Sequence, residues 1–126
     1  MVQNSLQLKK ILVVEDDEMN FIYLNQIFKI ARMSIIRART GYEAIEIVKH
    51  KNDIDLILMD IQLPDISGIE VTQKIRAIYP EIPVIAQTAA KSEFEKDSMI
   101  QAGCTDVLVK PFKMEELLSK IKEYLS

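Results

Sequence analysis

Short apolar runs alternate along the chain with longer segments that have helical periodicity. Continuous apolar runs are typical of parallel strands whose two faces are both covered by helices. We predict strands over residues 11–14, 35–38, 56–59, 83–86 and 107–109. Because Arg37 and Arg39 interrupt the apolar character of the second run, we place that strand at an edge of the sheet.

A helical segment follows each predicted strand. The last is the clearest, since Leu117, Leu118 and Ile121 recur at the spacing of one helix face. The fourth opens with a capping box at 92–95 and can end at Gly103. Its apolar residues do not share one face, so we expect this helix to be the element that moves most readily.

Five strand–helix units in 126 residues predict one open, doubly wound α/β domain. Ligands of such sheets bind at the carboxyl ends of the strands. We therefore look for chemistry at that rim.

Composition narrows the function classes. A formal net charge of −3 argues against non-specific binding to nucleic acid, which needs concentrated Lys and Arg. No apolar run approaches the roughly 18 residues of a membrane span, and the polar first ten residues do not form a signal peptide. The single cysteine, Cys104, excludes an internal disulfide and suits a reducing compartment. We expect a cytoplasmic protein with no membrane partner.

Polar residues stand at the ends of four of the predicted strands. Glu15 and Asp16 follow the first, Asp60 the third, Thr88 the fourth and Lys110 the fifth. If the strands are parallel, these groups converge on one rim.

Three carboxylates at one rim repel one another unless a cation lies between them. Mg²⁺ suits such a site, because it keeps several waters and accepts a phosphate oxygen. The charges of Glu15, Asp16 and Asp60 are then balanced by Mg²⁺ and Lys110. A carboxylate such as Asp60 can attack phosphorus to form an aspartyl phosphate, with Lys110 and Thr88 stabilising the phosphoryl oxygens.

The stretches 11–17, 58–64, 88–89 and 109–112, together with Gly68, resemble the receiver domain of two-component signalling proteins. The resemblance covers roughly residues 9–125, and around Asp60 it is most similar to stand-alone cell-cycle regulators and receivers of hybrid kinases. It implies a flavodoxin-like fold with five helices and strand order 2-1-3-4-5. We accordingly assign an N-terminal extension to residues 1–8 and a receiver domain to residues 9–126.

The resemblance also implies roles for the rim residues. Asp60 would be the phosphoacceptor. Asp16 would bind Mg²⁺ directly, Glu15 through a water, and Gln62 through its backbone carbonyl. Thr88 and Lys110 would contact the phosphoryl group.

Two further features follow from the same resemblance. The Lys110–Pro111 bond would be cis. Many receivers carry, three positions before the lysine, an aromatic residue that swings inward with the threonine. Here this position is Val107, so the aromatic part of that switch is in doubt.

His50 is the only histidine and lies near the end of a predicted helix, so the phosphate must come from a partner. The resemblance implies a sensor histidine kinase or a histidine phosphotransfer protein as donor. Output would pass to a downstream protein through the face of the fourth helix, fifth strand and fifth helix, with no direct contact to nucleic acid.

Other interpretations stay open at this point. Asp60 could be a strand-end cap or a salt-bridge partner of Lys110, and the acids at 15–18 could be a solvated loop. A small aspartate-based phosphohydrolase is a second function class, although it needs an Asp-x-Asp pair where this chain has Asp16, Asp17 and Glu18. A receiver fragment of a hybrid histidine kinase and a pseudo-receiver without phosphoryl chemistry are further alternatives.

Overall fold

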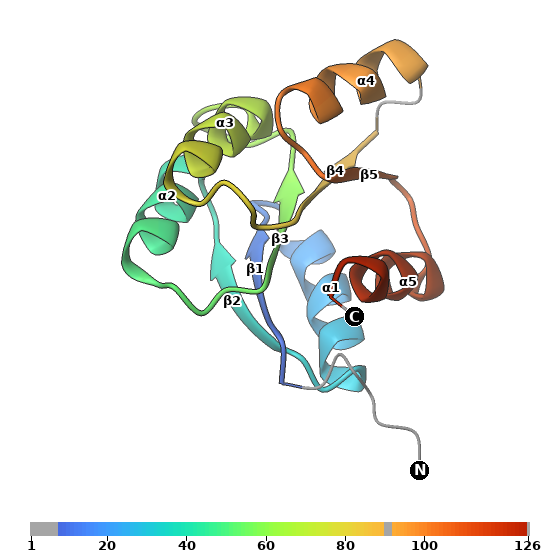
Figure 1. Ribbon diagram of the computed structural model, residues 1–126. Helices are drawn as coiled ribbons and strands as arrows, with labels where there is room; N and C mark the ends of the chain where they lie inside the picture. The colour runs from blue at the N-terminus through green and yellow to red at the C-terminus, as the bar shows by residue number, and fades with distance from the viewer. Residues whose placement is uncertain (1–7, 90–91, 126) are drawn as a thin grey trace.

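Five parallel strands form one sheet in the order β2-β1-β3-β4-β5 (Figure 1). The strands are β1 Lys10–Val14, β2 Ser34–Ala38, β3 Leu56–Asp60, β4 Val84–Thr88 and β5 Asp106–Val109. This confirms the flavodoxin-like order and the place of β2 at an edge. The computed structural model describes residues 8–89 and 92–125, so the assigned extension, apart from Leu8, lies outside the described residues.

The strand β4 begins later and reaches further toward the rim than its apolar run predicts. Pro83 has no N–H to donate to a ladder and precedes the strand. At the other end, the Gln87 carbonyl accepts the Ile61 N–H at 3.2 Å, and Thr88 pairs with Val109 of β5. Gln87 and Thr88 therefore belong to the sheet.

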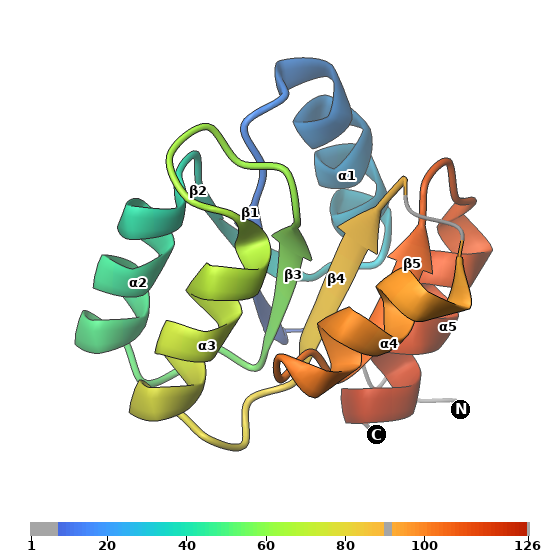
Figure 2. The ribbon, with the colours of Figure 1, turned by 90° about the horizontal axis from the view of Figure 1, so that it is seen from above.

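The helices are α1 Glu18–Ile30, α2 Gly41–His50, α3 Gly68–Ile78, α4 Glu93–Gln101 and α5 Met114–Leu125. Helices α1 and α5 cover one face of the sheet, and α2, α3 and α4 cover the other (Figure 2). The predicted start of α4 at Ser92 is confirmed, because the Ser92 hydroxyl accepts the Glu95 N–H at 3.1 Å, and the same hydroxyl donates to the Glu95 carboxylate. Gly103, with φ of 118°, follows the last turn.

Side chains along each strand alternate between the two faces. On β1, Leu12 and Val14 pack with the residues of α2 and α3, whereas Ile11 and Val13 pack with those of α1 and α5. On β4, Ile85 belongs to the α1 and α5 side. The same alternation decides which polar side chains meet at the rim.

Helix α4 is thinly packed, as its sequence pattern predicts. Met99 is its one buried residue, and Phe94 is 80% exposed. A cavity of about 620 Å³ lies beside it, with Ile69 and Thr88 among its lining residues. Within residues 8–89 and 92–125, no helix has both the length and the apolar character needed to cross a bilayer.

Candidate functional site

Three polar side chains form a row across adjacent strands at the carboxyl edge of the sheet. Asp60 pairs with Gln87 of β4, and the pairing of Val14 with Met59 brings Glu15 opposite Asp60. All three are buried, with exposed fractions of 0% for Glu15, 5% for Asp60 and 0% for Gln87. The order β1-β3-β4 thus places Asp60 at the centre of the row.

Glu15 is held by three donors that come from three places in the chain. Its Oε2 accepts the backbone N–H of Asp17 at 3.1 Å, and its Oε1 accepts Nε2 of Gln87 at 3.0 Å. Oε1 also accepts Nδ2 of Asn20, on the first turn of α1, and that Nδ2 lies 3.2 Å from Oε1 of Gln87. The orientation of the Glu15 carboxyl is therefore fixed by its surroundings.

Glu15 and Asp60 lie in direct contact, and this contact is electrostatically unfavourable when both are charged. Burial raises the pKa of Glu15 from 4.5 to about 7, and the hydrogen bond and charge of Asp60 add to the rise. The hydrogen bonds from Asn20 and the Asp17 backbone act in the opposite direction and are outweighed. A cation bound here would relieve the repulsion.

Asp60 has a partner on its other side. Nζ of Lys110 lies 3.4 Å from Asp60 Oδ1, and the backbone N–H of Gln62 donates to the same oxygen at 3.1 Å. The Lys110 N–H donates to the Thr88 carbonyl at 2.7 Å, so the ends of β4 and β5 hold these two residues side by side. The Lys110–Pro111 peptide bond is cis, as the resemblance predicts.

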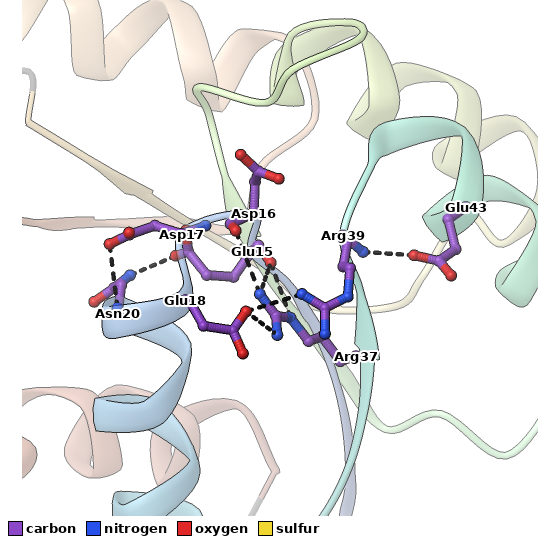
Figure 3. A network of polar contacts seen from close by, with 8 residues as sticks. All are labelled: Glu15, Asp16, Asp17, Glu18, Asn20, Arg37, Arg39 and Glu43. Carbon is purple, nitrogen blue, oxygen red and sulfur yellow. Dashed lines mark hydrogen bonds and ion pairs between the residues drawn. The ribbon is translucent and has the colours of Figure 1, made fainter.

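Asp16 departs from the predicted convergence of three carboxylates. Its side chain is exposed, and Figure 3 shows it directed away from the Glu15 carboxyl. The reason is its place after the end of β1, where the chain turns outward toward α1. Among the residues that the structure describes, no three His, Cys, Asp or Glu side chains come together as a ready-made metal cage. Glu15, Asp60 and Lys110 do come together.

The edge strand β2 contributes a residue that the sequence pattern did not reveal. Nε and Nη2 of Arg37 donate to the Glu15 carbonyl at 3.1 and 3.0 Å, and Nη2 reaches the Asp16 carbonyl at 3.4 Å (Figure 3). The guanidinium also lies 4.2 Å from the ring centre of Phe21 and pairs with Glu18 at 2.8 Å. The sequence analysis took its rim residues from the other four strands and therefore missed Arg37.

The donor set fits a hard divalent cation. Two buried carboxyl groups meet, and Lys110 is 3.4 Å from one of them. Mg²⁺ is commonly held by one or two carboxylates and several waters, so a full protein cage is not required. Burial, followed by the hydrogen bond and the charge of Asp60, raises the pKa of Glu15, so a cation at this edge would favour its ionised form.

Comparison with known proteins gives a consistent result. Residues 11–122 match the family model described as the response regulator receiver domain. The polar-differentiation response regulator DivK of Brucella ovis is 36% identical over 119 residues, which is 93% of this chain and 96% of that protein.

Solved structures agree in fold and in sequence. The receiver domain of a sensor histidine kinase from Pseudomonas aeruginosa, with a magnesium ion in its active-site cleft, is 30% identical with a TM-score of 0.87 over 94% of this chain and 98% of that one. The receiver domain of Ssk1 from Saccharomyces cerevisiae, crystallised with the histidine phosphotransfer protein Ypd1, is 31% identical with a TM-score of 0.88 over 95% and 90%.

Proposed function

The chain belongs to the response regulator receiver domain family and acts as a signalling phosphoacceptor, and we propose that Asp60 is the residue it phosphorylates. The observation that carries this proposal is the position of the Asp60 carboxyl. It lies at the end of the central strand β3, is 5% exposed, and stands between Glu15 and the Lys110 ammonium. A carboxylate in this position can act as a nucleophile, and the Lys110 ammonium can neutralise charge on the phosphoryl oxygens.

The transfer is a displacement at phosphorus. An Asp60 oxygen forms the new P–O bond while the P–N bond of a partner's phosphohistidine breaks, and the imidazole leaves with the electron pair. Lys110 neutralises charge on the phosphoryl oxygens, and the Thr88 hydroxyl donates a hydrogen bond to one of them. Hydrolysis of the acyl phosphate later restores the carboxylate.

We assign the ion of this site as Mg²⁺. Asp60 and Asp16 would hold it directly, the Gln62 carbonyl would complete the protein ligands, and Glu15 would act through a water. Since Asp16 lies on an exposed loop, its side chain is free to turn toward the rim. When bound, the ion supplies positive charge for the phosphoryl oxygens. The magnesium in the related kinase receiver supports this assignment.

The donor is a sensor histidine kinase or a histidine phosphotransfer protein, because His50 is the only histidine of the chain and is exposed at the end of α2. The complex of the related Ssk1 receiver with Ypd1 supports this choice. Output passes through the face of α4, β5 and α5. Thin packing around Met99 and the cavity next to Thr88 leave α4 free to respond.

Two of the other interpretations disagree with specific observations. A phosphohydrolase acting on external substrates disagrees with the family, whose members are signalling phosphoacceptors. A pseudo-receiver disagrees with the contact of Asp60 with Glu15 and Lys110. A receiver from a hybrid kinase would use the same site chemistry. Cytoplasmic placement stays a prediction, in keeping with the free thiol of Cys104.

Labelling with a small acyl phosphate tests the proposal. Wild-type protein in Mg²⁺ should gain one phosphoryl group, as measured by intact mass, and a chelator should abolish the label. Asp60→Asn should remain unlabelled. Asp65→Asn is the matched control, because Asp65 lies in the loop that follows Asp60 but accepts the N–H groups of Gly41 and Tyr42 instead of facing the site. A label that persists in Asp60→Asn would refute the assignment.

A further inference from the structure

Gln87 is a buried polar residue in a strand whose other buried side chains, except Thr88, are apolar. Burying an amide group costs free energy unless its donors and acceptor are paired. Both ends of the Gln87 amide are paired here, with Nε2 donating to Glu15 and Oε1 accepting from Asn20. The strand thus carries an amide that donates to Glu15 and accepts from Asn20, which is itself a donor to Glu15.

This amide links strands that are not neighbours. Strand β3 lies between β1 and β4, and Asp60 sits in the row between Glu15 and Gln87. The bridge therefore spans the central strand and joins the end of β1, the end of β4 and the first turn of α1. Asn20 belongs to that turn because its backbone N–H donates to the N-cap Asp17 at 3.2 Å.

We propose that Gln87, together with Asn20, is a positioning residue that holds the Glu15 carboxyl against Asp60, so that the cation site is formed before the cation arrives. This inference rests on the proposed function of the site. Two charged carboxylates in contact would otherwise separate by rotation of the longer Glu15 side chain. A dication would then have to reverse that rotation and order the side chain as it binds.

Removing an outer partner of a metal ligand typically lowers metal affinity by about 10- to 100-fold. The variant Gln87→Met keeps the length and volume of the side chain but has no donor. We expect it to weaken Mg²⁺ binding about tenfold, as measured by calorimetric titration. Asn20→Ala, at a more accessible position, should act in the same direction and provides a second test if Gln87→Met is poorly folded.

A double-mutant cycle separates positioning from general damage. If Gln87 acts through Glu15, then Gln87→Met should change affinity by less than about twofold in a Glu15→Gln background. Thr72→Val is the control, because Thr72 is also a fully buried polar residue but donates to the Gly68 carbonyl within α3. The Mg²⁺ affinity of Thr72→Val should match that of the wild type.

A measurement without metal completes the test. The ¹³C chemical shift of the Glu15 carboxyl in the metal-free protein should change in Gln87→Met and Asn20→Ala and stay constant in Thr72→Val. Wild-type affinity in Gln87→Met, or an equal loss with and without Glu15, would overturn the positioning role alone. Failure of the wild type to bind Mg²⁺ would overturn the proposed function as well.

Discussion

Replacing Glu15 by Gln should make the metal-free protein more stable above neutral pH. The native state holds the proton of Glu15 more tightly than the unfolded chain, since the pKa rises from 4.5 to about 7 on folding. The native state therefore loses stability as the pH increases from about 4.5 to about 7. The full pKa rise corresponds to a loss of about 3 kcal/mol in the unfolding free energy. A glutamine at position 15 does not titrate, so the variant does not lose this stability.

Urea unfolding in a chelator, at pH 5 and at pH 8, measures this effect. The difference in unfolding free energy between Glu15→Gln and wild type should grow by roughly 2–3 kcal/mol between these pH values. Glu81→Gln, which changes an exposed glutamate, should follow the wild type throughout. A difference that stays constant with pH would show that the burial of Glu15 against Asp60 carries no such cost, and would refute the reasoning.

Adding Mg²⁺ extends this prediction. A ligand at 100 times its dissociation constant stabilises the native state by about 2.7 kcal/mol. The wild type should gain this stability at pH 8, where Glu15 is ionised, and much less at pH 5. Equal gains in stability at both pH values would show that Mg²⁺ binding does not depend on the charge of Glu15.

Three further substitutions test other parts of the site. Lys110→Ala removes the ammonium group that lies 3.4 Å from Asp60. Calorimetry should still detect Mg²⁺ binding, but the NMR shift changes that phosphorylation causes should be lost. Loss of Mg²⁺ affinity alone would contradict this role of Lys110. Arg37→Met removes the donors to the Glu15 carbonyl and should weaken Mg²⁺ binding about tenfold. An unchanged Mg²⁺ affinity would show that these hydrogen bonds do not support the metal site. Gly68→Ala places a methyl group against the Asp60 carbonyl and should cost about 2 kcal/mol in urea unfolding; wild-type stability would mean that the loop yields easily.

Much of the fold could be predicted from local patterns. Apolar runs indicate the strands, and the capping box and Gly103 mark the ends of α4. Burial on both faces of a parallel sheet leaves a continuous signal of this kind, which needs no knowledge of neighbours. The strand order, in contrast, came from the resemblance to the family, because periodicity contains no information on which strands pair.

The parts of the site that were missed depend on that pairing. Gln87 stands out in the sequence as a polar residue beside an apolar run, but its partner Glu15 is 72 residues away and becomes a neighbour only through the β1-β3-β4 order. Arg37 marked an edge strand correctly, yet its reach to the Glu15 and Asp16 carbonyls depends on the register of β1 with β2. The outward direction of Asp16 depends on the loop after β1.

The alternation of side chains along β4 gives the rim two separate sides. Gln87 points toward the helices α1 and α5, and Thr88, the next residue, lines the cavity beside α4. The side chains that hold Glu15 and the side chain next to the cavity are therefore supported by different helices, Asn20 by α1 and Met99 by α4. A rearrangement next to Thr88 can thus displace α4 without breaking the hydrogen bonds that hold Glu15, so the acidic side of the rim keeps its geometry while the other side changes.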